Sequence, residues 1–111
     1  MSSGAYERAE SDSWEERAAA GRELASEDDL AARTITRRLL DDPDLAVIEA
    51  TADALIRRGD SAGLELVLSR LATAEDQVAN TLLWIIWPAA HLYGLPMQGA
   101  VQAWRTTPTR Q

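Results

Sequence analysis

Apolar residues recur along the chain at spacings of three and four positions, with polar residues between them. Two consecutive stripes of this kind consist of Leu45, Ile48, Ala52 and Leu55, and of Leu64, Val67, Leu68 and Leu71. This spacing is typical of amphipathic helices that bury one face. No convincing segment shows the alternation of apolar and polar residues that a half-buried strand requires. We therefore expect an all-α fold of five or six short helices.

The apolar pattern repeats when the sequence is shifted by 31 residues. The shift aligns Leu24 with Leu55 and Ile86, and it aligns Ala25 with Ile56 and Trp87. Because the matched positions are mostly apolar, the repeated feature is the face that packs in the core, and Trp87 is expected to be ordinary core. Repeats of a few tens of residues are typical of stacked architectures. The sequence therefore predicts two to three units of two helices each.

Capping residues indicate where these helices begin. The segment from Ser13 to Glu16 is a capping box, and the segment from Ser26 to Asp29 is a looser version of one. Asp42 is expected to cap the next helix, with Pro43 at its first position. Asp60 or Ser61 is expected to cap the helix that follows.

Other residues indicate where the helices end. Arg57 and Arg58 followed by Gly59 are typical of a helix C-terminus. Pro88 is expected to end or kink the first helix of the third unit. A short helix is then expected near residues 96–104.

The second unit contains the residues by which a repeat family can be identified. They are Asp42-Pro43-Asp44-Leu45-Ala46-Val47, then Ala50, Ala52 and Ala54-Leu55, then Gly59-Asp60. This segment resembles the HEAT-like repeat, in the short form named after phycobilin lyases. The match is partial in the first unit and weak in the third, and Ile48 stands where the family usually has Arg. The resemblance covers roughly residues 13–104.

The resemblance implies a short α-solenoid of two to three helix pairs, a fold that commonly serves as a protein-binding scaffold. It implies no catalytic residue. We expect a flexible N-terminal tail at residues 1–12, the helical repeat domain at 13–105 and a C-terminal tail at 106–111. The expected function is a non-catalytic protein–protein interaction module.

Composition excludes several kinds of chemistry. The chain has no Cys, which excludes disulfides, thiolate metal sites and a cysteine nucleophile. Its single histidine, His91, does not support a histidine metal cluster or a catalytic triad, and we expect it to be hydrogen-bonded and partly buried. The net charge of −7 argues against binding to a nucleic-acid backbone. We expect no enzyme activity, no metal and no cofactor.

The acidic charge is concentrated at the front of the chain, because residues 1–30 hold nine acids and three arginines. This distribution supports an alternative function, a small immunity-like or antitoxin-like inhibitor of a basic protein. A lyase-type enzyme is a third and weaker alternative.

Residues 77–104 carry no charged side chain, so a membrane span must be considered. Pro88, Gly94 and Pro96 are among the residues that interrupt the apolar run, and we therefore expect no membrane insertion. The start of the chain lacks the apolar segment of a secretion signal, which favours a cytoplasmic location. All 11 basic residues are Arg and Ala is abundant, a composition that suggests a bacterial protein.

Three arginines lie about one helical turn apart on the second helix of the first unit, namely Arg33, Arg37 and Arg38. In HEAT-like folds this helix often lines the concave face. We expect these arginines to form a partner-binding groove with Glu65 and Ser69 of the next unit, since guanidinium groups suit carboxylates and phosphates. A simpler interpretation, which the sequence favours, pairs them with the nearby acids Asp29, Asp41 and Asp42.

Trp84 is anomalous, because the repeat aligns it with Arg22 and Asp53, which are expected to face solvent. The neighbouring Ile85 is anomalous in the same way. The C-terminal segment, through Tyr93 or Trp104, could cover the pair as a cap. A second copy of the chain or a foreign partner could cover it instead, since exposed apolar patches usually mark contacts. Three expectations therefore stay open, namely an internal cap, a homodimer and a foreign partner. The homodimer would form through Trp84, Ile85, Tyr93 and Trp104.

Overall fold

The computed structural model describes the backbone of residues 3–93 and the side chains of residues 4–88. All regular structure in these residues is helical, which confirms the all-α expectation for this part of the chain. The helices are α1 (Ser3–Ala9), α2 (Trp14–Leu24), α3 (Leu30–Leu39), α4 (Leu45–Arg57), α5 (Ser61–Thr73) and α6 (Asp76–Tyr93).

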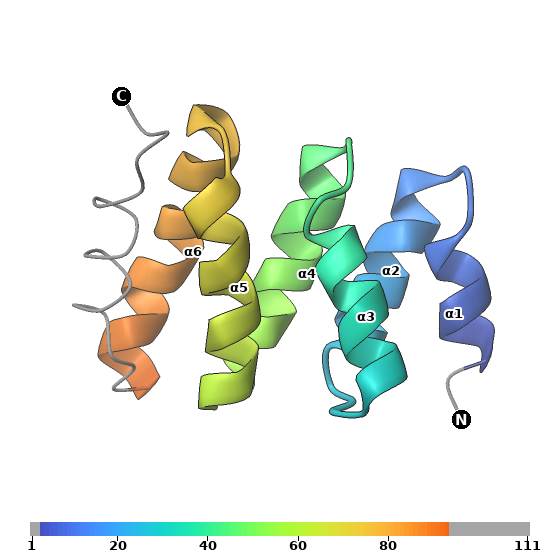
Figure 1. Cartoon of the computed structure of the whole chain (residues 1–111), viewed down its shortest axis with the longest axis horizontal. Helices are drawn as coiled ribbons and strands as arrows, with labels where there is room; N and C mark the ends of the chain where they lie inside the picture. The colour runs from blue at the N-terminus through green and yellow to red at the C-terminus, as the bar shows by residue number, and fades with distance from the viewer. Residues whose placement is uncertain (1–2, 94–111) are drawn as a thin grey trace.

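The helix starts repeat at the spacing predicted from the sequence. Helices α2, α4 and α6 begin at Trp14, Leu45 and Asp76, and α3 and α5 begin at Leu30 and Ser61, so that equivalent helices start 31 residues apart. Helix α4 packs between α2 and α6, and these three helices form one row. Helices α3 and α5 lie on one side of this row, toward the viewer in Figure 1.

The core follows the predicted stripes. The aligned residues Leu24, Leu55 and Ile86 are each at most 1% exposed, because they occupy the same position on the three helices of the row. Helices α2 and α4 approach closely at Gly21, where a Cβ atom would lie 2.0 Å from the Thr51 Oγ1 atom. Small residues at this position therefore set the distance between the first two helices of the row.

The structure confirms two of the predicted caps. The Ser13 hydroxyl accepts a hydrogen bond from the Glu16 backbone N–H, and α2 begins one residue after Ser13. The Asp60 carboxylate accepts from the Gly63 N–H at 2.8 Å and caps α5. Helix α4 ends at Arg57 as expected, and Gly59 has a positive φ of 73°. Gly tolerates this left-handed conformation, which turns the chain toward α5.

Two other predicted caps are wrong by two or three residues. Helix α3 is capped by Asp29 rather than Ser26, whose hydroxyl instead donates to the Glu23 carbonyl at the end of α2. Helix α4 is capped by Asp44 rather than Asp42. The Asp42 carboxylate is occupied by Arg17, whose Nε lies 2.9 Å away, and by the Asp44 N–H.

The expected flexible tail at residues 1–12 contains a helix. Helix α1 packs on α2 and buries Ala5 and Ala9, which are 0% and 4% exposed. The Arg8 guanidinium also pairs with Glu23 of α2 at 2.9 Å. Two alanines form so narrow an apolar stripe that the sequence pattern does not distinguish this helix from a tail.

Helix α6 departs from the prediction at two residues. It continues through Pro88 to Tyr93, so Pro88 does not end it, and the alternative that Pro88 kinks the helix stays a prediction. Trp87 is 55% exposed although its counterpart Ile56 is 2% exposed, and the expectation that it is core is wrong. Among the described helices, those that pack on α6 are α4 and α5. Helix α6 covers the side of α4 that faces away from α2, but no described helix covers the corresponding side of α6. The helix expected near residues 96–104 and the tail at 106–111 lie outside the described residues.

Over residues 3–93, the structure contains no helix whose length and hydropathy would suit a membrane span.

Candidate functional site

A groove runs between α3 and α5 on the side of the molecule where these two helices cover the row. It comprises two adjoining cavities of about 420 and 180 Å³, which share Arg37, Leu66 and Ser69. We call this surface the α3–α5 groove. Its lining residues are Arg33, Thr34, Arg37, Arg38, Asp41, Ala62, Glu65, Leu66, Ser69, Arg70 and Thr73.

All five residues that the sequence predicts for partner binding line this groove. Arg33, Arg37 and Arg38 project from α3, and Glu65 and Ser69 project from α5. The helical period places the three arginines on one face of α3, and the 31-residue repeat places α5 beside that face. The structure thus brings these side chains together, and their role in binding stays a prediction.

Most of the groove arginines are paired, but with other acids than the sequence suggests. Arg33 pairs with Asp28 at 3.1 Å, and Arg38 pairs with Glu10. The expected pairing with Asp29, Asp41 and Asp42 is wrong because those acids are already occupied. Asp29 caps α3, and the arginines that pair with Asp41 and Asp42 are Arg70 and Arg17.

Three polar side chains in the groove have no hydrogen bond or ion pair to any described residue. They are the Arg37 guanidinium, the Ser69 hydroxyl and the Glu65 carboxylate, and all three residues are exposed. Arg37 and Ser69 line both cavities, whereas Glu65 lines only the smaller one. Two free hydrogen-bond donors therefore lie where the two cavities meet.

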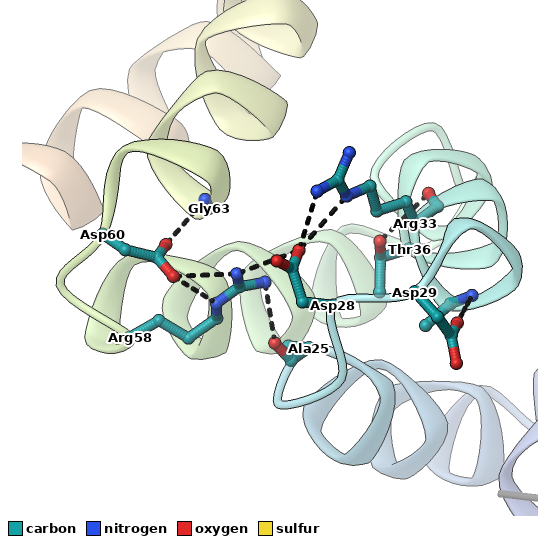
Figure 2. Close-up of polar contacts among 9 residues, drawn as sticks. Ala25, Asp28, Asp29, Arg33, Thr36, Arg58, Asp60 and Gly63 are labelled. Carbon is teal, nitrogen blue, oxygen red and sulfur yellow. Dashed lines mark hydrogen bonds and ion pairs between the residues drawn. The ribbon is translucent and has the colours of Figure 1, made fainter.

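One end of the groove is fixed by Arg58, an arginine that does not line the cavities and that directly follows α4 (Figure 2). Its side chain is only 13% exposed, and it reaches Asp60 at 2.8 Å and Asp28 at 3.3 Å. It also donates to the Ala25 carbonyl at 3.1 Å. Arg58 therefore joins the start of α5 to the turn before α3.

The contacts at this end of the groove lower the pKa values of two carboxyl groups, those of Asp28 and Asp60. The hydrogen bond and charge of Arg33 lower the pKa of Asp28, and the contact with Arg58 adds to this effect. The hydrogen bond from the Gly63 N–H lowers the pKa of Asp60, again with a smaller contribution from Arg58. Both carboxylates are therefore held in the ionised form that their partners require.

The other end of the groove is fixed by Arg70, which sequence reasoning did not identify. Its side chain is 12% exposed, and its Nε donates to the Leu40 carbonyl at 2.8 Å. Its guanidinium also lies 3.3 Å from Asp41 and 3.6 Å from Glu75. Arg70 therefore joins the last turns of α5 to the end of α3. The sequence indicates a place for Arg70 in the groove only through its position, which is one helical turn after Leu66 and therefore on the same face of α5.

The residues expected to form a self-association surface are only partly described. Trp84 is 73% exposed and Ile85 is half-buried against the core. The side chains of His91 and Tyr93 and the whole of Trp104 lie outside the described part of the chain. The exposure of Trp84 agrees with its alignment to solvent-facing positions and does not distinguish the three expected occupants.

Within the described residues, no group of three or more His, Asp or Glu side chains is arranged to hold a metal ion. Comparisons with protein-family models, with curated proteins and with solved structures give no match.

Proposed function

We propose that this protein is a non-catalytic interaction module, built as a short α-solenoid of HEAT-like helix pairs, which binds a partner protein in the α3–α5 groove. The 31-residue spacing of helix starts and the row of α2, α4 and α6 support the solenoid. The absence of Cys and the single His of the full sequence support a role without catalysis. A cytoplasmic location and a bacterial origin are parts of the proposal that rest on composition alone.

The observation that carries the proposal is an open groove between two helices that are joined at its ends by two arginine bridges. Arg58 and Arg70 are nearly buried, and each ties α5 or the turn before it to the unit that precedes it. The bridges leave Leu66 and the free Arg37 side chain at a concave surface. Protein-binding surfaces are enriched in Arg and combine apolar contacts with a polar rim.

A protein partner is favoured over a nucleic acid because of charge. The whole chain carries a net charge of −7, so a long polyanion that extends beyond the groove meets a surface that is negative on average. Charges separated by more than ~10 Å are largely screened at physiological ionic strength. A short segment of a protein therefore responds mainly to the local charge of the groove.

The alternative of an acidic inhibitor has less support. Three of the nine acids in residues 1–30 are paired with an arginine, as Glu10 is with Arg38, Glu23 with Arg8 and Asp28 with Arg33. Three more, namely Glu15, Glu16 and Asp29, accept hydrogen bonds within the chain. An acidic surface that recognises a basic partner needs carboxylates that are free to pair with it. Strong binding to a basic protein through residues 1–30, unaffected by changes in the groove, would favour this alternative.

Photo-crosslinking tests the proposed groove. A benzoyl-phenylalanine placed at Ser69 is expected to capture one partner in cells that express the protein. The same probe at Arg22, an exposed position on α2 outside the groove, is expected to capture little. Binding of the captured partner is then measured with Arg37→Ala and Arg38→Ala combined. If the double variant binds as well as the wild type, the groove is not the docking surface.

A further inference from the structure

The charge balance of the α3–α5 groove is opposite to that of the whole protein. Four arginines line it, against the two acids Asp41 and Glu65. Three of these arginines already have carboxylate partners, and Asp41 is itself held by Arg70. Two charged groups of the groove therefore have no ion-pair partner among the described residues. They are the Arg37 guanidinium, which lines both cavities, and the Glu65 carboxylate, which lines the smaller one.

We infer that the α3–α5 groove binds an acidic, partly apolar peptide segment of its partner, an inference that rests on the proposed function. A carboxylate of the segment accepts hydrogen bonds from Arg37 and from the Ser69 hydroxyl. An apolar side chain of the segment lies over Leu66, which is 6% exposed and lines both cavities.

Arg37 is the reason for assigning an acidic ligand. Its guanidinium offers a planar pair of N–H donors that matches a carboxylate, and charge-assisted hydrogen bonds of this kind are stronger than neutral ones. No described residue competes for it, so binding does not require an existing ion pair to break. A basic segment would instead place its charge beside the unpaired Arg37, which lines both cavities, and could pair only with Glu65, which lines the smaller one.

The shape of the groove indicates how long the segment is. The lining residues of α5 run from Ala62 to Thr73, a distance of roughly 16 Å along the helix. An extended peptide advances about 3.3 Å per residue, so about five residues span the groove. The Arg37 and Ser69 donors lie near the middle of this length, where both cavities meet.

Titration of the isotope-labelled protein with synthetic peptides tests the inference by NMR. The first probe is a seven-residue peptide of alternating Glu and Leu, and the matched probes replace Glu with Gln or with Lys. The Glu peptide is expected to shift the amide signals of residues on α3 and α5 and the side-chain Nε signal of Arg37. The Gln peptide is expected to bind at least tenfold more weakly. Sodium phosphate alone is titrated in parallel.

Three variants sharpen the result. Arg37→Ala is expected to weaken binding of the Glu peptide about tenfold, the loss of one charge-assisted contact. Arg22→Ala removes the same charge from an exposed arginine that also has no partner among the described residues, and it is expected to change binding less than twofold. Glu65→Gln removes the free acid of the groove and is expected to strengthen binding of the Glu peptide.

Several outcomes would overturn the inference. If the Lys peptide shifts the groove signals and Arg37→Ala strengthens its binding, the groove docks a basic segment, and the proposed function survives with a different ligand. If phosphate shifts the same signals as strongly as the Glu peptide, the site binds simple anions. If no peptide shifts the groove signals, this ligand assignment fails, and the crosslinking at Ser69 decides the proposed function separately.

Discussion

The two sides of the α4 helix are built in opposite ways. Toward α2 the helices touch through small side chains, and no space remains for even one carbon atom between Gly21 and Thr51. Toward the α3–α5 groove, two further helices are joined at their ends by arginine bridges and leave cavities of about 420 and 180 Å³ between them. Burial of apolar area stabilises the first side, whereas the second exposes polar groups that water or a ligand must satisfy. Substitutions on the first side should therefore change the stability of the fold, and substitutions on the second should change binding.

The largest effect is expected from opening the packed row. Leu55→Ala removes a side chain that is 1% exposed and should lower the free energy of unfolding by ~3 kcal/mol. Leu30→Ala is the matched control, because Leu30 is 79% exposed at the start of α3, and it should cost less than ~0.5 kcal/mol. Urea unfolding followed by circular dichroism measures both. Equal losses would contradict the assignment of the core to the row.

Overfilling the contact between α2 and α4 should have the next largest effect. Gly21→Ala should destabilise by ~2 kcal/mol, because its Cβ would overlap the Thr51 Oγ1 atom. Gly4→Ala in α1 meets only the flexible end of Arg8 and should stabilise slightly through helix propensity. Combining Gly21→Ala with Thr51→Ala should recover part of the loss, since the nearest remaining atom is the Thr51 Cβ at 3.1 Å. Additive losses in the double variant would contradict the close contact.

The same contact contains a polar atom that should weaken the fold. The Thr51 Oγ1 atom is buried without a hydrogen-bond partner among the described side chains. Thr51→Val replaces it with a methyl group of similar size and should stabilise the protein by ~1 kcal/mol. Thermal unfolding of the variant and the wild type checks the direction. A loss of stability would mean that the hydroxyl has a partner, such as a bound water molecule.

The polar end of the groove should respond to acid. Asp60→Ala removes the N-cap of α5 and should cost ~1 kcal/mol near pH 7, whereas Asp60→Asn keeps a cap acceptor and should cost less. Because the folded pKa of Asp60 lies below the ordinary value of 3.8, its ionised form favours folding above that pH. The advantage of the wild type should therefore be lost as the pH falls below 3.8. Urea unfolding between pH 7 and pH 2 would contradict this assignment if the difference did not change.

The smallest effect on stability is expected at Trp84. Since its indole is 73% exposed, Trp84→Glu should keep the free energy of unfolding within ~0.5 kcal/mol of the wild type. A loss of more than ~2 kcal/mol would indicate that the indole is covered as part of a cap. Light scattering on both proteins then separates the remaining expectations. A dimer that becomes a folded monomer identifies a self-association surface, and two monomers leave this face for a foreign partner or for none.

Residues that obey the local helical period could be placed from the sequence alone. Arg37 and Ser69 lie in one groove because each occupies a predictable face of its helix, and the 31-residue repeat sets the two helices side by side. Arg70 could not be found in this way, since its role depends on reaching the Leu40 carbonyl of the preceding unit. The predicted ion-pair partners of the groove arginines are wrong for the same reason, because a long side chain can reach several acids and only the tertiary packing decides which of them lie near.

The 31-residue repeat also fails to predict the structure at the two ends of the row. Trp87 occupies the position of Ile56 but is exposed. Helix α4 packs on helices of the units before and after it, whereas the described helices that pack on α6 are α4 and α5, which both precede it. Helix α1 lies before the first repeat unit and packs through Ala5 and Ala9, whose small side chains form a weak pattern. Alignment within a repeat thus predicts burial only where the neighbouring units are the same.

The most direct test of the groove as the docking surface is amide hydrogen exchange on the non-covalent complex of the wild-type protein with the partner that crosslinking identifies. Exchange reports on every helix in one measurement. Binding in the groove should slow exchange at the exposed ends of α3 and α5 and leave the exposed face of α2 around Arg22 unchanged. Protection confined to α6 around Trp84, or to residues 1–30, would contradict the assignment of the α3–α5 groove.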